Sequence, residues 1–175
     1  MMLSLPQLAE AFGQLLRNGA TRPEGQAPEH PGSPGAANLA APATACRLTD
    51  YALKGYHLDV TVSPGEVVSA ASLLDGEGFA LDAITGLDWM ADGQMEVVYD
   101  YFHPRNALRV VVRTRLPRAE PVVPTISTVF PGANWHEREA HDFFGIRFLG
   151  HPDLTPLLLP EDADYHPLRK DFALS

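Results

Sequence analysis

The sequence contains a single cysteine, Cys46, among 175 residues. One cysteine cannot form an intrachain disulfide, a CxxC redox pair, or an all-cysteine iron–sulfur cluster or zinc site within this chain. Long apolar runs are also missing, since no stretch of about 18 apolar residues occurs, and the first residues lack the features of a signal peptide. We therefore expect no membrane span, and a location in the cytoplasm or docked on the cytoplasmic face of a membrane.

Basic residues are scarce, because 13 Lys and Arg stand against 22 Asp and Glu, giving a formal net charge of −9. Nucleic-acid-binding proteins present a basic stripe to phosphates, so a general nucleic-acid partner is not expected. Residues 55–104 hold nine acidic residues and no Lys or Arg, whereas residues 105–118 hold five arginines. This segregation favours cross-strand ion pairs, each worth a few tenths of a kcal/mol up to about 1. The alternative is an arginine strand that faces a partner.

The N-terminal segment, residues 1–18, has the pattern of an amphipathic helix over residues 3–17. Its apolar side chains recur at helical spacing: Leu5, Leu8, Phe12, Leu15 and Leu16. Residues 19–45 follow, in which 17 of 27 are Gly, Pro or Ala, a composition typical of a flexible linker. The helix can therefore serve as a docking arm or pack back onto its own domain, and the pattern leaves both open.

Residues 46–132 are predicted to form an α+β domain. Alternation predicts a strand at residues 57–62, and the capping box from Ser63 to Glu66, with Pro64 at the first helical position, predicts a helix at 64–76. Three further strands are indicated by apolar alternation: Phe79, Leu81, Ala83, Thr85, Leu87 and Trp89; then Met95, Val97, Tyr99 and Tyr101; then Leu108, Val110, Val112 and Leu116, with Arg109, Arg113 and Arg115 opposite. We expect a mixed or antiparallel sheet of about four strands with helical cover, plus an extended C-terminal docking tail.

Residues 133–175 begin with a predicted helix at 134–144, introduced by a capping box from Asn134 to Glu137 and ended by Gly145.

The two histidines of this helix, His136 and His141, are five residues apart and so lie about 140° apart around an α-helix. The zinc-peptidase pattern needs histidines at i and i+4, so zinc hydrolysis is not expected. A weaker metal site combines Glu137 and His141 with His151 or His166. Gly-rich phosphate loops and nucleophile motifs are missing from the sequence.

Three blocks of sequence occur in order here: NWHERE through DFFGI (residues 134–146), GHPDL (150–154) and HPLRKDF (166–172). In these blocks the chain resembles the 30 kDa subunit family of respiratory complex I, also called the C subunit of NADH-quinone oxidoreductase. Related chains serve membrane-bound nickel–iron hydrogenases and formate hydrogenlyases. The resemblance extends more loosely back to about residue 57.

The resemblance implies a non-catalytic structural subunit of the peripheral arm of an electron-transport complex. Such a subunit forms a hetero-oligomer with the 49 kDa-type partner, or with a hydrogenase large subunit, and with iron–sulfur subunits. The iron–sulfur clusters, and the FMN or nickel–iron centre, would lie in those partners, and this chain would carry no cofactor. Thr155-Pro156 stands where complex I members commonly have a basic residue after GHPDL, and residues 161–164 form an acidic insert. These departures count in favour of the hydrogenase-type alternative, because local differences in charge determine which partner an interface binds.

Charged anchors around apolar side chains are typical of subunit interfaces. The expected partner-docking residues are Glu137, Arg138, Glu139, Asp142, Phe143, Phe144, Gly145, Gly150, His151, Pro152, His166, Pro167, Arg169, Lys170, Asp171 and Phe172. We expect no catalytic, cofactor-binding or metal-binding role for them. The competing hypotheses are a small metal-dependent enzyme and a free-standing adaptor with a tethered helix.

Overall fold

The computed structural model describes residues 3–19 and 45–173. The segment predicted to be a flexible linker lies outside the described residues, apart from its two ends. Gly19 is the last residue of a helix and Ala45 the first residue of a strand.

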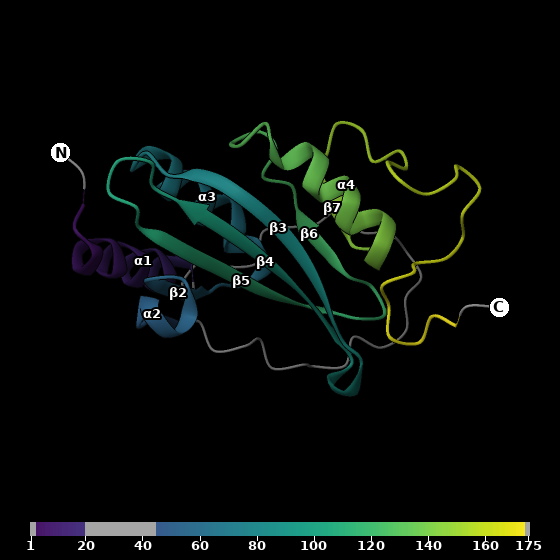
Figure 1. Cartoon of the computed structure of the whole chain (residues 1–175), viewed down its shortest axis with the longest axis horizontal. Helices are drawn as coiled ribbons and strands as arrows, with labels where there is room; N and C mark the ends of the chain where they lie inside the picture. Colours follow the sequence, from purple (N-terminus) through teal and green to yellow (C-terminus); the bar gives the residue numbers. More distant parts are fainter. Residues whose placement is uncertain (1–2, 20–44, 174–175) are drawn as a thin grey trace.

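The described residues form a five-stranded mixed sheet in the order β1-β2-β5-β4-β3 (Figure 1). Its strands are β1 (Ala45–Leu48), β2 (Leu58–Thr61), β3 (Ala80–Trp89), β4 (Gln94–Phe102) and β5 (Arg109–Pro117). The β2–β5 pair is parallel and the other pairs are antiparallel. The predicted α+β class with a mixed sheet is confirmed. The short β1 was not predicted, because its four residues do not alternate between apolar and polar and their exposure shows no two-residue period.

The helical elements are α1 (Leu5–Gly19), α2 (Tyr51–Lys54), η1 (Pro64–Glu66), α3 (Val67–Gly76), η2 (Met90–Asp92) and α4 (Ala133–Phe144). The predicted capping box at Ser63 and Glu66 is confirmed. A separate parallel pair, β6 (Val122–Pro124) and β7 (Arg147–Leu149), flanks α4 in sequence. The sequence predicted only a Pro-rich bend before α4, because strands of three residues leave no periodic signal.

The core lies on one face of the sheet, between β4 and β5 on one side and α3, α4 and the β6–β7 pair on the other. The predicted inward sets of β4 and β5 are buried as expected: Met95, Val97, Tyr99 and Tyr101, and Val110, Val112 and Leu116. From the helical layer, α3 contributes Val67, Ala70, Ala71 and Leu74. This layer fixes α4 against the sheet and so positions the segment that follows it.

The predicted inward face of β3 was wrong over its second half. Ile84, Gly86 and Asp88 are buried, whereas Leu87 and Trp89 are 36% and 39% exposed. The cause is a register shift between Leu81 and Ala83, since one extra residue moves every later side chain to the opposite face. Gly86 thereby faces α4, where an added Cβ would lie 2.5 Å from the ring of Phe144.

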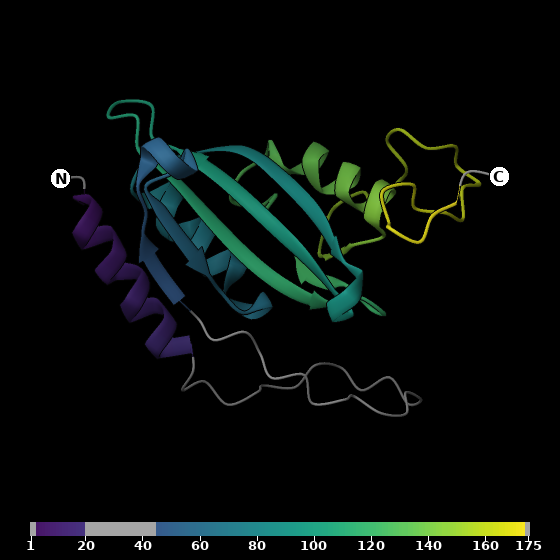
Figure 2. The same cartoon turned by 60° about the horizontal axis from the view of Figure 1, so that its bottom comes forward.

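Helix α1 packs back onto its own domain, which decides between the two alternatives. Leu8 and Phe12 are buried in the common core. The Leu3 amide donates a 2.9 Å hydrogen bond to the Glu77 carboxylate, and the Cys46 thiol donates to the Ala9 carbonyl at 3.7 Å. Figure 2 shows α1 lying along the β1 side of the sheet.

The other face of the sheet carries the segregated charges as ion pairs. Arg113 of β5 pairs with Asp59 of β2 at 3.0 Å, and Arg115 pairs with Glu96 of β4 at 3.2 Å. Arg109 pairs with Asp82. The predicted cross-strand ion pairs are therefore confirmed for these three arginines.

Candidate functional site

Helix α4 is the framework of the candidate docking segment. It ends at Gly145, which adopts a left-handed conformation with φ of 72° and donates its amide to the His141 carbonyl. The predicted capping box at its start was wrong, because Gly132 is the N-cap and no side chain caps the helix. The side chain of Glu137 instead points away from the helix start and into the core.

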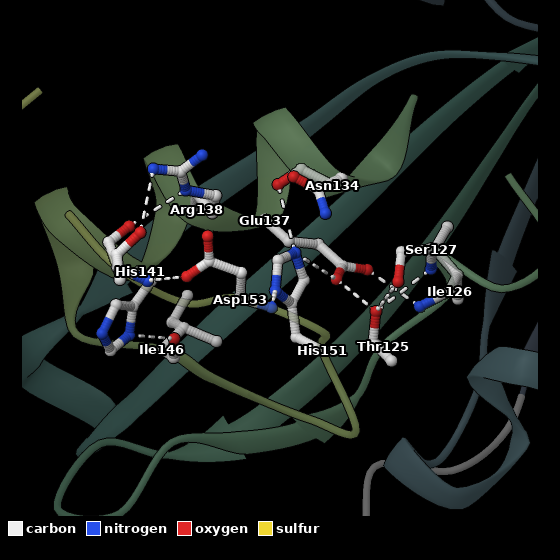
Figure 3. Close-up of polar contacts among 11 residues, drawn as sticks. Thr125, Ile126, Ser127, Asn134, Glu137, Arg138, His141, Ile146, His151 and Asp153 are labelled. Carbon is white, nitrogen blue, oxygen red and sulfur yellow. Dashed lines mark hydrogen bonds and ion pairs between the residues drawn. The ribbon is translucent and has the colours of Figure 1, made fainter. Parts of the chain in front are cut away.

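Glu137 is fully buried, with its partners supplied by the loop after β6 (Figure 3). One carboxylate oxygen accepts the Ile126 amide at 2.8 Å, and the other accepts the Thr125 hydroxyl. Burial raises the pKa of Glu137 to about 7, although these two hydrogen bonds favour its charged form. The carboxyl group therefore ties α4 to the loop that precedes it.

His151 closes the other side of the Glu137 carboxylate. Its Nε2 lies 3.8 Å from the nearer carboxylate oxygen of Glu137 and 3.2 Å from the Asn134 carbonyl oxygen. Its Nδ1 accepts the Asp153 amide at 3.1 Å, so Nε2 carries the ring proton and faces these two oxygens. His151 thus fixes the turn after β7 against the start of α4.

The four candidate metal ligands are not brought to one point. His141 contacts the Ile146 carbonyl through Nδ1 at 2.9 Å, and His166 contacts the Asp142 carbonyl through Nδ1 at 2.8 Å. Within residues 3–19 and 45–173, no three His, Cys, Asp or Glu side chains are arranged to hold a metal ion. The described geometry therefore gives no support to the metal-dependent alternative.

Asp142 holds the tail to the side of α4. One of its oxygens accepts the amides of Leu157, Leu158 and Leu159 at 2.8, 2.8 and 3.3 Å. Burial of Asp142 disfavours its charged form, but the three amides outweigh this effect and keep its pKa below the usual range. A nearly buried carboxylate therefore fixes three successive residues of a segment without helix or strand.

Arg138 fixes the residues just before these. Its guanidinium donates to the carbonyls of Thr155 and Pro156 at 2.9 and 3.0 Å. It also lies 5.4 Å from the ring centroid of Trp135, which is 60% exposed. The unusual Thr155-Pro156 pair thus offers backbone carbonyls to the chain's own helix.

The C-terminal end of α4 is covered by a second part of the tail. Arg169 donates to the Phe144 carbonyl at 2.7 Å, which places a cation at the negative end of the helix dipole. A Cβ added to Gly145 would lie 2.5 Å from both Arg169 and His166. Gly145 is therefore required both by its backbone conformation and by the closeness of these side chains.

The tail reaches β3 through Asp88, which the sequence did not single out. Arg118 donates to both oxygens of Asp88 at 2.8 and 3.0 Å and also contacts Asp171 at 2.7 Å. The Lys170 amide donates to Asp88 at 2.9 Å. The hydrogen bonds from Arg118 hold the pKa of Asp88 below its usual range. Asp88 was missed because the unpredicted register shift reversed its face.

The sixteen predicted docking residues lie on α4, the turn after β7 and the tail, at one end of the molecule (Figure 1). The exposed ones are Glu139, Gly150, Pro152, Lys170 and Asp171; the partly buried ones are Arg138, Phe143, Phe144, Gly145, His151, His166, Pro167, Arg169 and Phe172. Glu137 and Asp142 are buried and bonded internally, so their predicted place on the contact surface is corrected: they position that surface from within. The prediction also missed exposed apolar side chains of this region, among them Trp135, Leu158, Tyr165 and Leu168.

The chain is thus an α+β protein with a mixed sheet and a C-terminal segment that side chains of α4 and β3 hold by hydrogen bonds. Residues 60–175 match the family described as respiratory-chain NADH dehydrogenase, 30 Kd subunit. The chain belongs to this family. The resemblance seen in the three sequence blocks is therefore confirmed.

Individual relatives agree with this assignment. The NADH-quinone oxidoreductase C subunit of Chelativorans sp. is 37% identical over 134 residues, covering 74% of this chain and 66% of the relative. The corresponding C subunit of Roseiflexus castenholzii is 38% identical over 67% of this chain and 70% of the relative. The mitochondrial 30.4 kDa subunit of Neurospora crassa is 38% identical over 67% of this chain and 43% of the relative. The matched regions thus span from less than half to about 70% of these relatives' lengths.

Solved structures share the fold. A structure of the membrane-bound sulfane sulfur reductase, an archaeal respiratory membrane complex, contains a chain that matches with a TM-score of 0.68 and 23% identity, covering 94% of this chain and 85% of that one. A trypsin-resistant fragment of Nqo5 matches with a TM-score of 0.55 and 29% identity, covering 63% of this chain and 89% of the fragment. Among the described helices, none has the length and apolar character to span a membrane.

Proposed function

We propose that this chain is a non-catalytic structural and assembly subunit of the peripheral arm of a complex I-type NADH-quinone oxidoreductase. It docks to the 49 kDa-type partner through α4 and the tail, on the cytoplasmic face of the membrane. Electrons pass through iron–sulfur clusters and FMN held by the partner subunits. Family membership supports the complex, and the geometry of the tail supports the docking role.

The observation that carries the proposal is the way residues 150–173 are held. This segment has no helix or strand, yet Arg138, Asp142, Asp88 and the end of α4 fix it at separate points. A long irregular segment loses much conformational entropy when it is fixed. The fixed segment presents Leu168, 53% exposed, and the charged side chain of Lys170 outward. Such a preorganised mixture of apolar and charged groups lowers the entropic cost of binding a partner.

The hydrogenase-type alternative loses part of its sequence argument. It rested on Thr155-Pro156 and on the acidic insert. The Arg138 contacts there use mainly backbone carbonyls, which any residue pair offers. We therefore retain the complex I-type assignment and treat a nickel-containing large subunit as an outcome of the experiment.

The test is affinity purification of the tagged full chain from cells that make the complex. The variant Trp135→Ala/Lys170→Glu changes two outward side chains and leaves the internal contacts of Arg169 intact. We expect recovery of the large and iron–sulfur subunits to fall on the order of ten-fold or more, because aromatic and charged anchors dominate interface energies. Thermal unfolding of the variant should match that of the unmodified chain.

The matched control is Leu53→Ala, an 80% exposed apolar position in α2, outside the docking segment. It should leave recovery unchanged. Undiminished recovery of the partner subunits by the double variant would refute the docking role. Recovery of a nickel-containing large subunit with the unmodified chain would replace the complex I assignment by the hydrogenase-type one.

A further inference from the structure

Strand β3 forms an edge of the sheet, and its outer side is free of backbone partners within the described ranges. It pairs with β4 alone, and no described backbone hydrogen bond outside this ladder involves residues 80–89. About half of the amide and carbonyl groups along its ten residues point away from β4, and these groups form a template for another extended chain. Proteins usually protect such an edge, and β3 has one interruption, the register shift between Leu81 and Ala83. Residues 83–89 beyond it keep regular pairing with β4, so their outer edge can pair with another strand.

Helix α4 runs beside this edge (Figure 1). Two adjoining hollows lie between the helix and the strand, and together they form the β3–α4 groove. One hollow of about 380 Å³ lies between residues 83–86 of β3 and residues 136–144 of α4. A second, of about 320 Å³, lies between residues 86–89 and Phe144, Leu168 and Lys170. The two hollows share Gly86, Phe144 and Leu168 and are therefore continuous. Each is lined by consecutive β3 residues, which shows that the strand edge, and not one face, forms the wall.

The groove combines an apolar centre with charges of opposite sign along its length. Leu87, Phe144 and Leu168 line its centre. Glu139 lines the hollow beside residues 83–86, and Lys170 lines the hollow beside residues 86–89. A segment that fits these walls must be extended, apolar at its centre and oppositely charged at its two ends.

We propose that the β3–α4 groove receives an extended segment of another subunit, which adds a strand to the edge of β3. Backbone hydrogen bonds to β3 supply the register, and alternate apolar side chains fill the space beside Phe144 and Leu168. The segment carries a basic residue that faces Glu139 and an acidic residue that faces Lys170. This inference rests on the proposed function, because it requires that the chain work within a complex.

Two other occupants fit less well. Residues 20–44 of this chain contain five prolines, which cannot donate to a ladder, and one large apolar residue, Leu39. A second copy that paired through its own β3 would also place its own α4 beside the groove. That space is already bordered by α4 of the first copy, so the two helices would compete for it. A single extended segment meets neither obstacle.

The experiment places the photo-cross-linker p-benzoylphenylalanine at Thr85 of the full chain within its native complex. Thr85 is exposed and lines the groove. We expect cross-links to one contiguous segment of another subunit, with apolar residues at alternate positions. Glu139→Lys should lower the cross-link yield, measured per recovered complex, about five-fold, since like charges would then face each other. The control places the cross-linker at Ser72, an exposed position on α3, and should not label that segment.

The outcomes separate this inference from the proposed function. Recovery of the complex with Thr85 cross-linked to residues 20–44, to a second copy or to nothing would overturn the inference and leave the proposed function standing. Recovery of the chain without any other subunit would overturn both.

Discussion

Replacement of Glu137 by Gln should remove most of the pH dependence that this residue gives to folding. The pKa of Glu137 is 4.5 without structural effects and about 7 in the folded chain, where the carboxyl group is buried. The folded state therefore binds the proton more tightly than the unfolded state. As a result, the free energy of unfolding rises as the pH falls through 7, and the gain is complete below about 4.5.

The size of the effect follows from these two pKa values. One pKa unit corresponds to about 1.4 kcal/mol, so the full difference between 4.5 and about 7 corresponds to about 3 kcal/mol. Between pH 8 and pH 5 the unmodified chain should gain about 2 to 3 kcal/mol from this group. Asp88 and Asp142 have lowered pKa values and stabilise the fold above the unfolded value of 3.8, so their contribution is lost only at lower pH.

The assay is urea unfolding of the chain and of Glu137→Gln at pH 8, 7, 6 and 5. Gln keeps an oxygen for the Ile126 amide and can donate to the Thr125 hydroxyl, so it mimics the protonated acid. The variant should be the more stable of the two at pH 8, and its advantage should shrink by about 2 to 3 kcal/mol at pH 5. Glu139→Gln, on the exposed side of the same helix, should follow the unmodified chain. The reasoning would be refuted if Glu137→Gln and the unmodified chain differed in their free energy of unfolding by the same amount at every pH from 8 to 5.

Three further predictions concern the fixed tail. Asp142→Ala removes the acceptor of three amides, so limited proteolysis should cleave near residue 158 many times faster, while the thermal unfolding midpoint of the sheet changes little. Gly145→Ala should lower the free energy of unfolding by about 1 to 3 kcal/mol, because it combines a left-handed backbone with a steric clash; an unchanged urea midpoint would contradict this. Arg118→Ala leaves the buried carboxylate of Asp88 with one amide donor, and should cost about 2 kcal/mol in urea unfolding at pH 7 and progressively less as the pH falls below 3.8.

The regular part of the fold follows directly from the sequence. In β4 and β5 apolar side chains recur with a two-residue period on the inward face, so the pattern predicts which face packs against the helices. It does not predict the burial of Glu96, Val98 and Val111 on the other face. The sequence pattern of α1 was equally clear, but it could not decide where Leu8 and Phe12 pack, because an amphipathic stripe shows that a helix needs a partner surface without showing which one.

For the candidate site, the sequence predicted a segment of the chain, and the structure adds internal contacts of that segment which the sequence did not predict. Family blocks pointed to α4 and the tail, yet Glu137 was interpreted as a capping residue because Asn134 stands three positions before it. A buried carboxyl group and a capping one have the same local spacing, and the difference lies in Thr125 and Ile126, which no helix pattern includes. Asp88 could not be found for a similar reason, since a single extra residue near Leu81 reversed the face of the strand.

The hydrogen bond between the Lys170 amide and Asp88 joins residues 82 positions apart in the sequence. During translation, β3 leaves the ribosome long before residue 170 does, so the sheet can fold while its contacts to the tail are still unmade. Under the proposed function, a chain that stalls or is cleaved before residue 157 would have a folded sheet but no finished docking surface. The contacts that shape this surface would then be missing from every unfinished copy.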